Sequence, residues 1–252
     1  MPGSAKGAQW MLRTRKRAIS WRNWLLSNGF SNRVYAESLT KLFGRTVPQP
    51  SDISDHLNTL YFMASMVRPK LLVECGVRSG NSTRALLAAA GDHNAHLISI
   101  DTDDCSAITI PLEFKALWHF VRADDVTFLT SEFEQYCRDQ GLASYADLVF
   151  IDTSHSYEHT RAELEASRSI LRPGGLLLLH DTNLRRHCVK LDNSIVLARN
   201  IDRGVMRAVE KFMDREYDEN LLFSDNQNGW VLFHMPYCAG LTILRKPFGF
   251  PS

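Results

Sequence analysis

Long apolar runs are missing from this 252-residue sequence, and none approaches the roughly 18–20 residues that would span a bilayer. A strong net charge is missing as well, because 29 Lys and Arg balance 28 Asp and Glu to leave +1 with neutral histidines. This balance gives no argument for binding to nucleic acid. With 44% hydrophobic and 23% charged residues, the composition is that of a globular protein with a large core.

Paired cysteines are also absent. The chain has five cysteines, an odd number, and no C-x-x-C pair. Neither a zinc knuckle nor a disulfide framework is therefore indicated. The default expectation is a protein of a reducing compartment such as the cytoplasm. The cysteines are scattered along the chain: Cys75, Cys105, Cys137, Cys188 and Cys238.

Acidic residues are absent from residues 1–36, which carry seven Lys and Arg and the tryptophans Trp10, Trp21 and Trp24. The composition is typical of a solvated arm with one short helix, and an organellar transit peptide has the same composition. A substrate lid, a dimer contact or a contact with an anionic surface would use the same residues. Prolines at 48 and 50 mark a boundary, so we expect a basic N-terminal helical extension at 1–50 and a domain at 51–252.

From residue 71 onward, apolar strands alternate with helical patterns. Strands that are apolar on both faces are typical of a parallel sheet covered by helices on both sides. Asn228-Gly229 predicts a tight hairpin, so the last strands are expected to be antiparallel. The sequence therefore predicts a doubly wound, Rossmann-like α/β fold, with Pro173-Gly174-Gly175 ending the helix before the last parallel strand. The parallel strands are expected at 71–73, 96–101, 119–122, 147–152 and 176–179.

The first strand leads into a glycine loop, E-C-G-V-R-S-G-N-S, at residues 74–82. Gly76 and Gly80 frame the loop, and Asn81 and Ser82 open a helix. Backbone N–H groups at such a helix start can bind a small polar ligand. The loop lacks the G-x-G-x-x-G spacing that seats a pyrophosphate, so a cofactor without a pyrophosphate fits better than NAD.

Acids stand at the ends of all five predicted parallel strands. Ligands of doubly wound sheets bind at this edge, and unpaired buried carboxylates there are costly. Asp101 lies 21 residues beyond Gly80, where an acid can accept hydrogen bonds from ribose hydroxyls. Asp124 and Asp125, which follow the third predicted strand, can bond an adenine amino group or cap the next helix. The acids are Glu74, Asp101, Asp124 with Asp125, Asp152 and Asp181.

Four motifs together resemble a class I S-adenosylmethionine-dependent methyltransferase. They are the E-C-G-V-R-S-G-N-S loop, I-S-I-D, D-L-V-F-I-D-x-x-H-S-Y-E and L-R-P-G-G-L-L-L-L-H-D-T, in that order between residues 70 and 181. The similarity is greatest to the O-methyltransferase branch that includes the macrolide-sugar, catechol-type and cephalosporin-hydroxylase-like proteins. The resemblance implies a seven-stranded sheet with an antiparallel C-terminal strand, S-adenosyl-L-methionine as cofactor, and a small hydroxylated acceptor.

The resemblance also assigns the cofactor residues one by one. The glycine loop would hold the methionine end, Asp101 the ribose, and Asp124 with Asp125 the adenine. Asp152 would lie beside the cofactor. The loop residues concerned are Glu74, Gly76, Arg78, Gly80, Asn81 and Ser82.

Several members of the resembled group bind a divalent cation, and the resemblance places it at Asp152 and Asp181 with His180 or Thr182. Catechol-type enzymes have Asp-Asn where this chain has Asp181-Thr182, and sugar enzymes have Glu-Asp where it has His180-Asp181. A hard cation such as Mg²⁺ prefers oxygen ligands, so His180 weakens that assignment. The alternative is that both acids contact cofactor or substrate directly.

O-methylation needs a base, because a neutral hydroxyl is a poor nucleophile. His155 follows Asp152 by three residues, and a histidine titrates near neutral pH. The resemblance supports His155 as the base, with His180 and Asp181 as further catalytic candidates; the alternative for His155 is packing or capping of the following helix. A non-methylating protein of the same fold, such as a hydroxylase-like protein or a binding module, and an NAD-dependent enzyme are the competing hypotheses.

The acceptor itself is not identified by the sequence. In this fold the acceptor pocket is expected to come from residues 1–50 and from 184–203, which are predicted to form a loop. Aromatic and basic residues in these segments suit an acidic or aromatic acceptor, and equally a contact in a homo-oligomer. They are Trp21, Trp24, Phe30, Arg185, Arg186 and His187.

Overall fold

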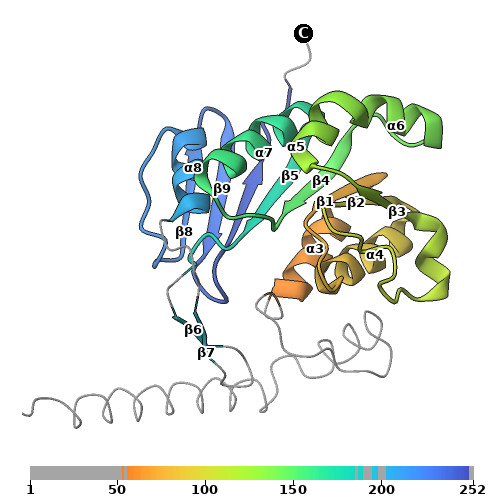
Figure 1. Cartoon of the computed structure of the whole chain (residues 1–252). Coiled ribbons are helices and arrows are strands. Elements are labelled where there is room, and N and C mark those ends of the chain that lie inside the picture. The colour runs from red at the N-terminus through yellow and green to blue at the C-terminus, as the bar shows by residue number, and fades with distance from the viewer. Residues whose placement is uncertain (1–52, 54–55, 185–186, 190–194, 198–202, 250–252) are drawn as a thin grey trace, which may run out of the picture. The chain divides into compact units, whose positions relative to one another are not determined.

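The computed structural model describes residues 53, 56–184, 187–189, 195–197 and 203–249 (Figure 1). The predicted extension at 1–50, and Arg185 and Arg186, lie outside the described residues. No helix in the described part of the chain is long and apolar enough to cross a membrane.

One twisted sheet of eight strands, in the order β3-β2-β1-β4-β5-β10-β9-β8, forms the centre of the fold (Figure 1). The first five strands are parallel, and the last three are antiparallel to their neighbours. The predicted Rossmann-like fold with an antiparallel C-terminal strand is thus confirmed. The strands are β1 (Leu71–Cys75), β2 (His96–Asp101), β3 (Trp118–Arg122), β4 (Ala146–Ile151), β5 (Leu171–His180), β8 (Phe223–Gln227), β9 (Trp230–Met235) and β10 (Leu241–Arg245).

The sheet has eight strands rather than the expected seven, because β8 is added as an edge strand. Asn228 and Gly229 both have positive φ, at 53° and 79°, and turn the chain tightly between β8 and β9. Residues of β8 alternate between half-buried and exposed, whereas those of β1 and β4 are all buried. The alternation fits an edge strand, and continuous burial fits central strands covered on both faces.

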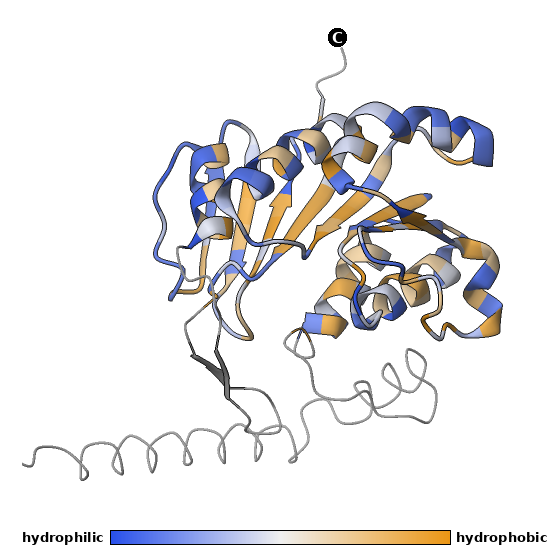
Figure 2. Cartoon of the chain, in the orientation of Figure 1, coloured by the Kyte–Doolittle hydropathy of each residue, from blue (hydrophilic) through white to orange (hydrophobic). Residues whose placement is uncertain are grey.

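Helices cover the two faces of the sheet (Figure 1). The helices α3 and α4 lie on one face, and α5, α6, α7 and α8 lie on the other. Figure 2 shows the apolar strands between the two layers of helices, with many polar residues along α6, α7 and α8. The helices are α3 (Leu57–Met66), α4 (Asn81–His93), α5 (Asp125–Thr127), α6 (Phe133–Gln140), α7 (Tyr157–Ile170) and α8 (Gly204–Met213), with short helical turns η2 (Leu112–Leu117) and η3 (Phe128–Glu132).

Two local predictions differ from the structure. Helix α7 ends at Ile170, and Pro173-Gly174-Gly175 lies inside β5, where Leu171 pairs with Ala146 but Leu176 pairs with Leu148. The extra residues form a bulge, and Gly174 supplies the positive φ of 74°. Part of the expected loop at 184–203 is a two-stranded ribbon of β6 (His187–Val189) and β7 (Ile195–Leu197).

Glu74 joins three elements from inside the core. Its side chain points to the α3–α4 face, where it accepts hydrogen bonds from Ser82 Oγ (2.6 Å), Thr83 Oγ1 (2.8 Å) and Ser99 Oγ (2.6 Å). The residue is 0% exposed. Burial raises the pKa of Glu74 to about 7, although the three hydroxyl donors lower it. This carboxyl therefore holds β1, β2 and the start of α4 together.

The buried carboxyl makes stability depend on pH. A carboxyl whose pKa is about 7 when folded and about 4.5 when unfolded binds its proton more tightly in the folded state. Its contribution to the free energy of unfolding is complete below about pH 4.5 and is lost as the pH rises to about 7. We expect Glu74→Gln to remove this pH dependence, as measured by urea unfolding between pH 4.5 and 8. Glu134→Gln, an exposed acid on α6, is the control; equal pH profiles for the wild type and Glu74→Gln would contradict the assignment.

Candidate functional site

A cavity of about 310 Å³ opens at the carboxyl ends of β1, β2, β3 and β4. This is the edge where ligands of doubly wound sheets bind, and the volume is at the lower end for small-molecule sites. Thr102, Thr153, Ser154 and His159 contribute to its wall, although the sequence did not single them out. The cavity also collects six predicted residues: Gly76, Arg78, Asp101, Asp124, Asp125 and Asp152.

Gly76 allows the loop after β1 to cross directly over the end of β4. Its φ is 90°, and a Cβ atom at this position would lie 2.1 Å from the Asp152 carbonyl oxygen. The Gly76 N–H donates to the Ile100 carbonyl at 2.9 Å, and the Asp152 N–H donates to the Cys75 carbonyl at 2.9 Å. No residue with a side chain fits here, so the backbone itself forms one wall of the cavity.

Asp101 fixes the glycine loop from the end of β2. Its Oδ2 accepts from the Val77 N–H (2.8 Å) and the Arg78 N–H (3.1 Å), and its Oδ1 accepts from the Asp103 N–H (2.9 Å). Although burial alone would raise the pKa of Asp101, these N–H donors lower it. An ionised carboxylate therefore lies at the cavity edge and shapes the loop beside it.

The start of α4 lies behind this loop. Gly80 is the N-cap residue with a φ of 75°, and a Cβ there would lie 2.5 Å from Ile108 Cδ1. Asn81 is the first residue of the helix, whereas Ser82 is turned into the core toward Glu74. This placement of Glu74 and Ser82 differs from the expected contact with a cofactor, because their side chains are enclosed and bonded to each other.

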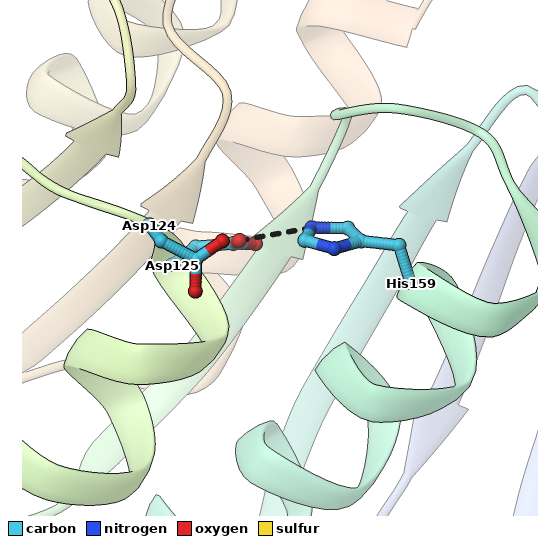
Figure 3. Close-up of side chains that lie close together, drawn as sticks. All are labelled: Asp124, Asp125 and His159. Carbon is cyan, nitrogen blue, oxygen red and sulfur yellow. Dashed lines mark hydrogen bonds and ion pairs between the residues drawn. The ribbon is translucent and has the colours of Figure 1, made fainter.

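Asp124 caps the next helix, and Asp125 contacts a histidine instead (Figure 3). Asp124 caps α5, since its Oδ1 accepts from the Thr127 N–H at 2.8 Å and from Thr127 Oγ1 at 2.7 Å. Asp125 is buried and lies 3.0 Å from His159 Nε2, which reaches it from α7. The hydrogen bond from His159 offsets burial and lowers the pKa of Asp125, and the same bond raises the pKa of His159.

Glu163 lies behind this pair and was not predicted. It is fully buried, and its Oε1 accepts from Thr153 Oγ1 at 2.6 Å. Burial raises the pKa of Glu163 well above its ordinary value, and the neighbouring Asp125 raises it further. Two carboxyls in one buried site share one proton, and the directions of the shifts place it on Glu163.

A second cluster brings all three predicted catalytic residues together beside Asp152. His155 Nε2 lies 2.7 Å from Asp181 Oδ2 and 3.4 Å from Asp152 Oδ1. His180 Nδ1 lies 3.5 Å from Asp152 Oδ1 and 3.4 Å from Asp181 Oδ1. Despite burial, the two carboxylates raise the pKa of His155 to about 9 and that of His180 well above its usual range. Burial alone would raise the pKa values of the two carboxyls, but the histidines lower that of Asp181 to about 2. They also hold the pKa of Asp152 well below its ordinary value.

The surroundings of His180 include a histidine that the sequence did not reveal. His180 Nε2 donates to the Cys238 carbonyl at 3.1 Å, and the His56 ring packs edge-on against the His180 ring at 5.6 Å. His56 Nε2 donates to the Tyr237 carbonyl at 2.9 Å. Thr182, an expected alternative metal ligand, is buried with its hydroxyl 3.4 Å from His234 Nδ1.

Two groups of described side chains have donor atoms close enough for one metal ion. Asp124, Asp125 and His159 form one group, and Asp152, His155 and Asp181 form the other; within each group the atoms lie within 4.8 Å of one another. Each group contains a buried carboxylate oxygen without a hydrogen bond of good geometry, Asp125 Oδ2 in the first and Asp181 Oδ1 in the second, and the latter faces His180 Nδ1 at 3.4 Å. The carboxylate and imidazole donors of either group are of a kind that binds divalent cations.

One family of known proteins matches the part of the chain that forms the cavity. Residues 73–182 match the family described as "Methyltransferase domain". No curated protein matches the sequence of the chain.

Three solved structures illustrate the fold. Cofactor-bound Rv0187 from MTB is 13% identical with a TM-score of 0.57, covering 90% of this chain and 96% of that one. A candidate caffeoyl-CoA O-methyltransferase from Staphylococcus aureus is 16% identical with a TM-score of 0.55, covering 91% and 99%. An O-methyltransferase from Bacillus cereus in complex with SAH is 14% identical with a TM-score of 0.53, covering 84% and 88%.

These identities are low, so the solved structures show the fold alone. The family match adds the domain type and covers the strands that build the cavity, from β1 to the end of β5. The resemblance found in the four motifs is thereby confirmed. Residues 73–182 thus match a methyltransferase domain, and the fold of the chain is the one seen in solved O-methyltransferases.

Proposed function

We propose that the protein transfers the methyl group of S-adenosyl-L-methionine to a hydroxyl oxygen of a small acceptor molecule. The observation that carries the proposal is the cavity at the carboxyl ends of β1–β4, bounded by the Gly76 loop and by Asp101. The family match and the O-methyltransferase fold support it. The row of acids in the cavity suits a ligand with hydroxyl and amino donors.

The cavity residues suit such a cofactor in three places. The Gly76 backbone would lie against the methionine end, where a Cβ would already meet the Asp152 carbonyl. Asp101, held ionised by the loop N–H groups, would accept from the ribose hydroxyls. Asp124, on the far side of the cavity, would accept from the adenine amino group, with His159 beside it. Glu74 would act only through β1 and the start of α4, which flank the loop and which its hydrogen bonds hold together.

In methyl transfer the acceptor oxygen forms a bond to the methyl carbon while the bond from that carbon to sulfur breaks. When bound here, the cofactor supplies a methyl group on a positively charged sulfur, and this charge is lost on transfer. The residues of the chain position the acceptor oxygen in line with the methyl group and exclude water. The hydroxyl proton has to leave the oxygen at the same time.

We propose that this proton leaves at the cluster of Asp152, His155 and Asp181. Asp152 lines the cavity and belongs to the cluster, so the two sites are continuous. His155 is the predicted base, and its side chain is 26% exposed. With both carboxylates beside it, the pKa of His155 is about 9, so the ring carries a proton at neutral pH in this arrangement. A base role for His155 requires that proton to be released or displaced first.

Asp101→Asn tests the cofactor site. Removing the charge should weaken binding of S-adenosylhomocysteine at least tenfold, because charge-assisted hydrogen bonds contribute on the order of 1.5–3 kcal/mol. Isothermal titration calorimetry measures this change. Asp104→Asn is the matched control, since this exposed acid bonds only within its own turn to Ser106. No binding to the wild-type chain at millimolar ligand would refute the proposed function.

Gly76→Ala tests the backbone wall. Its Cβ would clash with the Asp152 carbonyl, so we expect S-adenosylhomocysteine binding to be lost by calorimetry. Gly141→Ala is the control, because Gly141 has a similar φ of 67° with nothing within 4 Å of an added Cβ. That variant should lose only about 1 kcal/mol of stability and bind normally. Unchanged binding in Gly76→Ala would remove the loop from the cofactor site.

A further inference from the structure

We infer that Glu163 is a positioning residue of the cavity: as a neutral carboxylic acid, it holds Thr153 and Asp125 in place from behind. Thr153 and Asp125 line the cavity, whereas Glu163 is fully buried. The inference goes beyond the proposed function, and its part on cofactor binding rests on that function. It gives a task to a buried acid that the proposed reaction does not use.

Three segments of the chain meet at Glu163. The residue lies on α7 and is 0% exposed. Thr153 follows β4, and its Oγ1 donates to Glu163 Oε1 at 2.6 Å. Asp125 is the first residue of α5, and its carboxyl is within hydrogen-bond distance of the Glu163 carboxyl. One buried side chain therefore connects two parts of the cavity wall that come from different segments.

A single proton accounts for the unpaired oxygen atoms of both acids. Asp125 Oδ2 and Glu163 Oε2 are buried and have no donor of good geometry. The other oxygen of each acid is used, since Asp125 Oδ1 accepts from His159 Nε2 at 3.0 Å and Glu163 Oε1 accepts from Thr153. A proton on Glu163 Oε2, donated to Asp125 Oδ2, would satisfy both remaining oxygens. Two ionised carboxylates would instead repel each other in a buried site.

The surroundings place this proton on Glu163 rather than on Asp125. His159 Nε2 lies 3.0 Å from Asp125 Oδ1 and 3.6 Å from Glu163 Oε1, so the imidazole favours a charge on Asp125. The Cys75 thiol, at the end of β1, is a further but weak donor to Asp125. Burial and the neighbouring Asp125 raise the pKa of Glu163 well above its ordinary value. Glu163 is thus the acid of the pair, and Asp125 is the carboxylate.

The bond from Thr153 to Glu163 determines which side of the threonine faces the glycine loop. Since the hydroxyl points to α7, the methyl group lies beside Gly76, where an added Cβ would be 3.4 Å from Thr153 Cγ2. Without its acceptor the hydroxyl would be free to turn to another staggered rotamer. Glu163 therefore fixes the part of the wall next to the place proposed for the methionine end of the cofactor.

The bond to Asp125 acts on the other part of the wall. Asp125 is buried and contacts His159, whose side chain lines the cavity (Figure 3). A proton donated by Glu163 holds one oxygen of the Asp125 carboxylate, and this fixes the direction of the oxygen that His159 contacts. A buried carboxylate that lacks a donor is costly, so loss of Glu163 would disturb this pair. The imidazole beside the proposed adenine position therefore depends on Glu163 as well.

Substitution of Glu163 in the full-length chain tests the inference. Glutamine has the shape of the protonated acid, donates an N–H in place of the O–H, and still accepts from Thr153. Leucine fills a similar volume but makes neither hydrogen bond. By isothermal titration calorimetry, Glu163→Gln should bind S-adenosylhomocysteine within about threefold of the wild type, and Glu163→Leu should bind it about tenfold or more weakly.

Ser167→Ala is the matched control. Ser167 is 0% exposed on the same helix, and its hydroxyl has no hydrogen bond of good geometry, so this variant should bind as the wild type does. A role of Glu163 in packing alone would not separate the glutamine variant from the leucine variant. Equal binding by these two variants, whether tight or weak, would overturn the inference.

Infrared spectroscopy tests the proton itself. A protonated carboxylic acid absorbs at a higher frequency than a carboxylate, and the difference between the wild type and Glu163→Gln at neutral pH isolates Glu163 from Glu74. We expect an acid band that is lost in the variant, and its absence would overturn the inference. Because this band needs no ligand, it also separates the two proposals: a wild-type chain that does not bind S-adenosylhomocysteine refutes the proposed function and leaves the state of Glu163 measurable.

A second variant keeps the test decisive if circular dichroism shows that Glu163→Leu does not fold. Thr153→Val breaks the bond to Glu163 from its other end and keeps the size of the side chain. It should weaken binding of S-adenosylhomocysteine about threefold or more, because the side chain is no longer fixed by a hydrogen bond. Unchanged binding in Thr153→Val would overturn the inference.

Discussion

The structure depends on the close approach of the loop after β1 to the end of β4. Gly76 lies so near the Asp152 carbonyl that a single methyl group at residue 76 would collide with it. Two backbone hydrogen bonds hold the crossing, from Gly76 to Ile100 and from Asp152 to Cys75. The crossing forms one wall of the cavity and also places Asp152, so the cavity and the cluster of Asp152, His155 and Asp181 share one constraint.

The segment from Asp152 to His159, which joins β4 to α7 and includes the first residues of that helix, contributes to two groups of side chains. Asp152 and His155 belong to the cluster beside β5, whereas Thr153 and His159 turn toward Asp125 and Glu163. A span of eight residues thus supplies two charged groups with separate partners.

The positions of the strands and of the acids at their ends could be predicted from the sequence because both follow from local patterns. Apolar runs that end in acids showed where the parallel strands end, and the Asn228-Gly229 turn showed where the antiparallel part begins. The direction of Glu74 could have been found from alternation along β1, since Leu71, Val73 and Cys75 face the opposite helices. His56, His159 and Glu163 could not, because their partners come from distant segments. His56, for example, bonds a carbonyl 181 residues away.

In the proposed reaction, the charge at the cavity edge would also affect how the spent cofactor leaves. Asp101 has a lowered pKa because loop N–H groups donate to it, so it stays ionised beside the cavity, whereas Asp125 and Asp152 are paired with histidines. The charge of Asp101 would attract a positively charged sulfonium and would have less hold on the neutral thioether that is left once the methyl group has gone. The carboxylate that would retain the charged donor would therefore favour release of the neutral product.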